Sequence, residues 1–151
     1  MANIVPDSFK AELLAGSHNF EYGVSAQVFK LALYVTTLGP PYTTSSTVYS
    51  TSNEVSSVGT NYSAGGNALT LDTLSGSVPG SNTAIVDFVN LTFSSVTLTA
   101  LGAAIYNSST TPANMLCLVL DFGGNKTATS GDFTIQFPNP TAADAIIRLG
   151  D

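Results

Sequence analysis

The chain has 151 residues and a net charge of −6 at pH 7, and only 9% of its residues are charged. This length predicts one domain, residues 1–151, that buries about 70% of the surface of its unfolded chain. Nucleic acid and anionic membranes attract clustered cations. The sequence has only four scattered cations, Lys10, Lys30, Lys126 and Arg148, which argues against both as partners.

Cys117 is the single cysteine, so no internal disulfide can form. It stands within an apolar run, where we expect a small buried side chain. The N-terminus has no basic stretch followed by an apolar core, and no window approaches the roughly 18 apolar residues of a membrane span. We therefore expect neither a signal peptide nor a transmembrane segment.

Residues 6–15 predict a short helix within an N-terminal segment, residues 1–16. Pro6 suits the first helical position because it has no N–H to donate. Phe9 and Leu13 are four residues apart and therefore share one face of the helix. That face either covers an open end of the domain or docks on a neighbouring subunit.

Residues 28–35 alternate in the manner of a β-strand, with Phe29, Leu31, Leu33 and Val35 on one face. The opposite face carries Lys30 and Tyr34, which predicts a face that is wet or meets a partner. The sequence Gly39-Pro40-Pro41 is expected to end this strand region.

A long loop is predicted over residues 39–66, which are rich in Ser, Thr and Gly and lack a regular hydrophobic period. Loops of this length in a compact domain are usually functional or mobile. Tyrosines in such a background are typical of protein-contact loops, because a tyrosine brings contact area and a hydroxyl group at low entropy cost. The loop therefore either meets another subunit or packs on its own domain, and its large side chains are Tyr42, Tyr49 and Tyr62.

Several further stretches alternate or are apolar throughout, as expected of strands: residues 68–74, 83–93, 96–100, 101–106 and 145–149. The alternation changes phase by one residue at Ser94 and Ser95. Such a change predicts a bulge or a turn at this point.

The most informative stretch is residues 115–137. It opens with the apolar run 115–120, which predicts a strand buried on both faces. It closes with residues 132–137, where Phe, Ile and Phe alternate with polar residues. Because turn-forming residues occupy 123–131, we expect a hairpin of these two strands at the centre of the domain.

The predicted fold is all-β: a two-sheet β-sandwich, jelly-roll or immunoglobulin-like, of about eight strands with one short N-terminal helix. Its strand order cannot be read from periodicity.

No catalytic, cofactor or metal site is predicted. His18, the single histidine, has no second histidine for a metal and no local nucleophile, so we expect a surface or capping role. Asp121, Asn125 and Asp132 flank one loop but lack the ligand spacing of a calcium loop, which favours capping and turn roles. Carboxylates are dispersed, so a paired acid–base site is not indicated either.

Five segments resemble small structural proteins of tailed bacteriophages: MANIVPDSFK (1–10), TSNEV (51–55), YSAGG (62–66), LDFGG (120–124) and GDFTIQF (131–137). Within that class, an acidic, Ser/Thr-rich β-sandwich of this size resembles the capsid decoration, or cement, proteins. The resemblance implies a virion protein on the outer capsid surface, made in the cytoplasm of a bacterial host.

The same resemblance implies that the partner is the major capsid protein of a tailed phage, met by a homo-oligomer or a symmetric array on the shell. It implies no cofactor. The lack of catalytic motifs argues against an enzyme, and the scattered cations argue against nucleic acid and membrane as partners. The expected contact residues are Phe9, Leu13, Tyr42, Tyr49 and Tyr62. A tail, fibre or adaptor protein is the alternative within the virion, and a carbohydrate-binding module is the alternative outside it.

Overall fold

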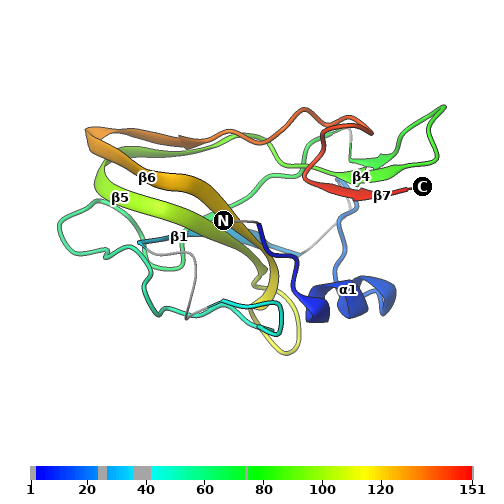
Figure 1. Cartoon of the computed structure of the whole chain (residues 1–151), viewed down its shortest axis with the longest axis horizontal. Coiled ribbons are helices and arrows are strands. Elements are labelled where there is room, and N and C mark those ends of the chain that lie inside the picture. The colour runs from blue at the N-terminus through cyan, green and yellow to red at the C-terminus, as the bar shows by residue number, and fades with distance from the viewer. Residues whose placement is uncertain (1–2, 24–26, 36–41, 74, 151) are drawn as a thin grey trace.

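Two antiparallel sheets and one short helix make up the fold (Figure 1), as seen in a computed structural model that describes residues 3–23, 27–35, 42–73 and 75–150. The helix is α1 (Asp7–Leu14). The strands are β1 (Phe29–Tyr34), β2 (Asn67–Ala68), β3 (Gly76–Ser77), β4 (Ala84–Val86), β5 (Leu91–Asn107), β6 (Met115–Ile135) and β7 (Ile147–Leu149).

The prediction of an all-β fold with one N-terminal helix is confirmed. The larger sheet has the order β2-β1-β5-β6 and the smaller sheet the order β3-β4-β7. Seven strands are found among the described residues, against about eight expected. No helix in the described part of the chain is long and apolar enough to cross a bilayer.

Strands β5 and β6 form one very long hairpin that bends back over itself (Figure 1). Their pairing runs from Leu91 opposite Ile135 to Asn107 opposite Met115. The two halves of the hairpin face each other across the larger apolar cluster, which contains Leu98 and Phe133 from one half and Ile105 and Leu118 from the other. The hairpin thereby supplies both layers of a sandwich-like arrangement.

The predicted hairpin of residues 115–120 with 132–137 is wrong. Residues 115–120 and 132–135 belong to the single strand β6 and pair with different halves of β5, whereas residues 136–137 lie beyond the end of β6. The intervening residues 123–131 hold a bulge and strand positions in place of a chain reversal. Local sequence could not distinguish the two, because glycine-rich residues suit a bulge as well as a turn.

The phase change at Ser94 and Ser95 does mark a bulge, as predicted. The pairing of β5 with β6 shifts register between Phe93 and Val96, and Ser95 has a positive φ of 55°. Leu91 to Asn107 is nevertheless one strand, so the stretches 96–100 and 101–106 are continuous with each other.

Strand β1 is buried on both faces, which corrects the expectation of a wet or partner-facing side. Leu31 and Leu33 belong to the larger core cluster, whereas Ala32 and Tyr34 belong to a second cluster on the opposite face. Tyr42 of the long loop lies in this second cluster and is itself buried. The loop therefore covers the face that alternation alone assigned to solvent or to a partner.

Helix α1 lies at the end of the molecule opposite the hairpin bend (Figure 1). Phe9 is fully buried in the larger core cluster, whereas Leu14 is 92% exposed. The burial of Phe9 agrees with the first of the two alternatives for this helix, that it covers an open end of its own domain.

The remaining strands are shorter than expected. Of the predicted strand 68–74, the described residues 68–73 contribute only the end of β2 and an isolated bridge from Leu71 to Phe88. The predicted strand 83–93 is interrupted after Val86. Residues 145–149 supply β7. The predicted stop at residues 39–41 lies outside the described residues.

Candidate functional site

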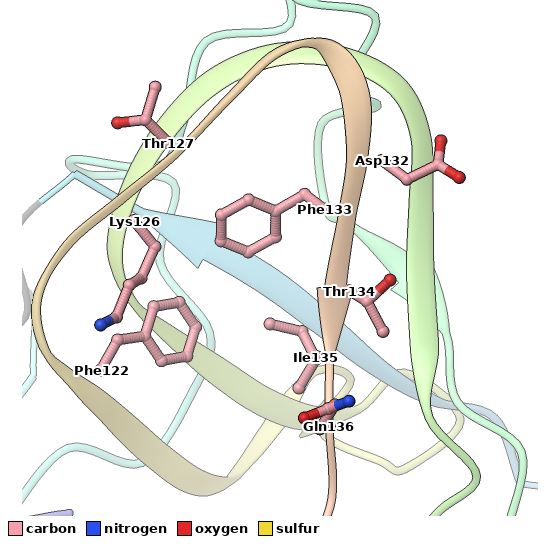
Figure 2. A pocket seen from close by; sticks show the side chains of 8 residues that line it. All are labelled: Phe122, Lys126, Thr127, Asp132, Phe133, Thr134, Ile135 and Gln136. Atoms are coloured by element: carbon pink, nitrogen blue, oxygen red, sulfur yellow. The ribbon is translucent and has the colours of Figure 1, made fainter.

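A groove opens between the two limbs of the bent strand β6 (Figure 2). Its volume is about 430 Å³. Phe133 and Ile135 are buried and Phe122 is half-buried. The residues that line the groove are Phe122, Lys126, Thr127, Asp132, Phe133, Thr134, Ile135 and Gln136.

Two irregularities in β6 shape this groove. Between the pairs Gly102–Asp121 and Ala100–Lys126, β5 advances by two residues while β6 advances by five. Gly123 has a φ of 71°, in the region that L side chains rarely adopt, and its N–H donates to Asp121 Oδ1 at 2.8 Å. The bend that makes the two limbs face each other lies further along, between Thr127 and Asp132 (Figure 2), where the pairing with β5 shifts register again and Ser130 has a φ of 46°.

The bend brings two aromatic rings together on the floor of the groove. The ring centroids of Phe122 and Phe133 are 6.2 Å apart. In Figure 2, Phe122, Phe133 and Ile135 point into the space between the limbs, and Lys126 points into the same space. The groove is therefore apolar inside, with one cation at its mouth.

Lys126 lies on the core side of an edge strand. It is paired opposite the fully buried Ala100 and shares a strand face with Ala128, which is also buried. Among the described residues, no salt bridge joins Lys126 to a carboxylate. A cation in this place is one of the features by which natural proteins discourage edge-to-edge aggregation.

The hydroxyl and carboxylate groups around the groove are held by the neighbouring strand β5. Asp132 Oδ1 accepts the N–H of Ser95 at 3.0 Å, and Thr134 Oγ1 lies 2.9 Å from Thr92 Oγ1. These contacts fix the rim. They agree with the capping role predicted for Asp132, and the bond from Asp121 to Gly123 agrees with that predicted for Asp121.

The groove combines apolar surface, one ammonium group and amide and hydroxyl groups. This composition suits the binding of a partly apolar ligand or peptide. The described residues contain no cluster of three or more His, Cys, Asp or Glu side chains that could hold a metal ion.

The predicted contact tyrosines lie elsewhere, in a hydrogen-bonded network around Glu54. Tyr62 donates its hydroxyl to Glu54 Oε1 at 2.7 Å, and Tyr49 donates to Glu54 Oε2 at 2.5 Å. The N–H of Gly65 also donates to Oε1, at 2.6 Å. Three donors from different parts of the loop thus converge on one carboxylate.

The network ties the loop to β1. Tyr62 Oη accepts the N–H of Leu33 at 3.0 Å, and the hydroxyl groups of Tyr34 and Tyr42 lie 2.8 Å apart. Burial raises the pKa of Tyr62, and it raises the pKa of Tyr106 to about 12. These phenols are therefore structural hydrogen-bonding groups at neutral pH.

The burial of Phe9, Tyr42 and Tyr62 corrects their proposed role as contact anchors. Each is at most 3% exposed within its own chain, and an anchor needs surface that a partner can reach. Tyr49 and Leu13 are half-buried, so a contact by these two stays a prediction. The missed signal was Glu54, the one acidic residue in the loop that could accept several hydroxyl groups.

His18 is buried, which corrects the expected surface or capping role. Its Nε2 lies 2.9 Å from Glu12 Oε2, and its Nδ1 lies 3.2 Å from Asn107 Nδ2 and 3.9 Å from Cys117 Sγ. Its ring also packs near Phe9, at a centroid distance of 5.2 Å.

A cysteine, a histidine and a glutamate in line suggest a nucleophilic triad, but the surroundings argue against one. Cys117 is fully buried, as predicted. Its burial, and to a smaller extent the nearby charge of Glu12, raises the pKa of its thiol. A nucleophilic cysteine needs the opposite shift and access to substrate. The cluster therefore acts as a packed polar core beneath α1.

The chain matches no known protein family model, no curated protein sequence and no solved structure.

Proposed function

We propose that the chain is a non-enzymatic structural protein of a bacteriophage virion, which binds the outer capsid surface and stabilises contacts between major capsid subunits. The sequence resemblance to decoration proteins first suggests this role. The observation that carries the proposal is the groove beside β6, because a preformed apolar groove along a strand edge is a surface suited to binding another protein.

The character of the domain supports the same role. Its low content of charged residues leaves little electrostatic opposition to contact with a protein shell. The described part of the long loop, residues 42–66, is tied to the sheet by Glu54 and its tyrosines, so these contacts are formed before binding. Preorganisation lowers the entropy cost of docking, and many copies on a symmetric shell strengthen weak contacts by avidity.

The partner under this proposal is the major capsid protein of a tailed phage, and the protein occupies the virion surface after synthesis in the host cytoplasm. The net charge of −6 disfavours nucleic acid and anionic lipid as partners.

Quantitative mass spectrometry of purified virions, separated into heads and tails, tests the proposal. We expect the protein in the head fraction at a copy number comparable to that of the major capsid protein. A few copies confined to tails would favour the tail or adaptor role instead. Absence from both fractions would refute a role in the virion.

A carbohydrate-binding module is the second candidate, and one observation favours it. Phe122 lines the groove from one limb of β6, and the polar residues Asp132 and Gln136 line it from the other limb (Figure 2). An aromatic ring in a groove with polar groups is a suitable surface for sugars. Screening of the protein on a glycan array separates the two proposals. Binding that is lost in Phe122→Ser would support the carbohydrate reading.

A further inference from the structure

We propose that His18 is the centre of a pH-sensitive switch. Its neutral ring holds the N-terminal segment, residues 3–23, on the domain, and a second proton on the ring loosens that segment. The segment includes α1. The switch is built from the contacts of one buried imidazole ring, and it does not depend on the capsid role.

Side-chain amides hold the part of this segment that follows α1. Among the described residues, no backbone–backbone hydrogen bond joins residues 16–23 to a strand. Gln27 takes over this role, because its Oε1 accepts the N–H of Asn19 at 2.7 Å and its Nε2 donates to Ser17 O at 3.1 Å. Asn107, at the end of β5, donates in turn to Gln27 Oε1 at 2.7 Å. The stretch is therefore fixed to the sheet by a network of two amide side chains.

Two backbone N–H groups determine which way these amides point. A backbone N–H can only donate, so the atom of Gln27 that meets Asn19 N is its oxygen, and Asn107 must meet that oxygen with its NH2 group. The other end of the Asn107 amide is fixed in the same way, since its Oδ1 accepts the N–H of Ser109 at 3.0 Å. The atom that lies 3.2 Å from His18 Nδ1 is therefore the donor Nδ2 of Asn107.

The ring of His18 is consequently neutral, with its proton on Nε2. Nδ1 accepts a hydrogen bond from Asn107 Nδ2 and so carries no proton, and Nε2–H donates to Glu12 Oε2 at 2.9 Å. The His18 side chain is 0% exposed, so solvent offers Nδ1 no other partner. The network thus selects one of the two neutral tautomers of the ring.

A second proton on the ring would disrupt this arrangement at Nδ1. The new N–H would point at the NH2 group of Asn107, so two donors would face each other in a site closed to solvent. Cys117 Sγ, 3.9 Å from Nδ1, is only a weak acceptor. Turning the Asn107 amide to present its oxygen would break its bonds to Gln27 and Ser109. Protonation therefore costs hydrogen bonds of the network that holds residues 16–23.

The charge of Glu12 does not cancel this cost. Among the described residues, Glu12 is the one charged side chain that is hydrogen-bonded to the ring. Its attraction for a charged ring is opposed by the removal of that charge from water, and the bond at Nε2 is made by both forms of the ring. The other groups that contact the ring are the aromatic rings of Phe9, Phe20 and Phe29 and Cys117, whose thiol stays uncharged because burial raises its pKa. The loss at Nδ1 is the difference that remains.

The direction of the pH effect follows from proton uptake. A histidine in water takes up its second proton near about pH 6.5, whereas the contact at Nδ1 keeps the held ring neutral. Below that pH the released segment binds one proton more than the held segment, so acid favours release. Uptake of one proton with this midpoint raises the released fraction about tenfold between about pH 7.5 and pH 5.5.

Nuclear magnetic resonance on the full chain tests the inference, because His18 is the only histidine in the sequence. At about pH 5.5, the ring nitrogen shifts should show a proton on Nε2 and none on Nδ1. Hydrogen exchange should show that the protection factors of the α1 amides fall about tenfold from the higher to the lower pH. At both pH values these amides should be less protected than those of Leu31 and Leu33 in β1, because the segment opens without unfolding of the sheet.

Three variants separate the switch from a purely structural role. His18→Asn removes the titrating ring, so the fall in protection of α1 with pH should disappear. Glu12→Gln is the matched control, because a glutamine oxygen still accepts Nε2–H, and its fall in protection should match or exceed that of the wild type. Asn107→Asp offers an acceptor to Nδ1–H, so its ring should carry both protons at the lower pH and its fall in protection should disappear.

Several results would overturn the inference. One is a wild-type ring with protons on both nitrogens at the lower pH, and another is protection of α1 that stays the same or increases there. A fall of equal size in His18→Asn would assign the pH effect to other groups. Equal protection of the α1 and β1 amides would show that the segment does not open separately. The wild-type measurements decide the inference even if Asn107→Asp does not fold.

Discussion

Replacing Tyr62 with phenylalanine removes one hydroxyl group and leaves the aromatic ring in the core. The hydroxyl takes part in two hydrogen bonds: it donates to Glu54 Oε1 at 2.7 Å and accepts the N–H of Leu33 at 3.0 Å. Glu54 retains its bonds from Tyr49 and Gly65 in the variant. The N–H of Leu33, which lies in a fully buried strand residue, loses its partner.

The expected destabilisation follows from these two losses. A buried donor without a partner costs about 1–3 kcal/mol, and a hydrogen bond to a charged group is worth about 1.5–3 kcal/mol. Because Glu54 is half-buried and keeps two other donors, we expect less than the sum, about 2–4 kcal/mol off the free energy of unfolding. That is a large share of the roughly 5–15 kcal/mol of a native domain.

Urea unfolding of the wild type and Tyr62→Phe measures this difference, provided that the slope against denaturant is unchanged. Tyr22→Phe is the control, because Tyr22 is 47% exposed and the same change at an exposed site is expected to alter stability by no more than about 0.5 kcal/mol. Hydrogen exchange should also show weaker protection of the Leu33 amide in Tyr62→Phe. Equal stabilities of the two variants would refute the assignment of Glu54 and Tyr62 as the tie between loop and sheet.

Three further predictions concern other buried groups. Asp87 is fully buried, and its Oδ2 has no hydrogen-bond partner among the described residues. Because burial raises the pKa of Asp87, its contribution to stability is full below the unfolded pKa of about 3.9 and is lost as pH rises through the folded pKa. Asp87→Asn should therefore gain stability relative to the wild type as pH rises, and parallel unfolding curves across this range would contradict the reasoning. Gly66→Ala should lower the free energy of unfolding by more than about 3 kcal/mol, since the new Cβ would lie 1.8 Å from Leu31 O. Gly16→Ala is the control, because nothing lies within 4 Å of its Cβ, and it should lower the free energy of urea unfolding far less. The buried thiol of Cys117 should react with a thiol reagent only under unfolding conditions, and rapid labelling of the native protein would show that its pocket opens.

The sequence alone determined the local elements. It predicted a helix over residues 6–15, which is found at Asp7–Leu14. It also predicted the strand around Leu31 and the doubly buried run at Met115, and both are present. It also located the bulge at Ser95. These features were predictable because neighbouring residues in the sequence show any change of hydrophobic period or phase.

The groove of the candidate site could not be predicted from the local sequence pattern. Phe122, Lys126 and Phe133 all belong to the stretch that the sequence singled out, yet the groove among them was not predicted. A groove requires that residues 123–131 bend a continuous strand, and the same glycines would equally suit a hairpin turn. Only the length of β5, which pairs with both limbs of β6, decides between them.

The tyrosines of the long loop were misassigned for a related reason. A sequence shows that Tyr42 and Tyr62 are large and amphipathic, and such residues occur both in interfaces and in cores. Which of the two applies depends on a partner for each hydroxyl group, and these partners, Glu54 and the N–H of Leu33, come from the far part of the loop and from β1. Hydrophobic period and composition are local properties of a sequence. The partner of a buried polar group or of a strand edge depends on how distant segments pack, so only the tertiary structure decides it.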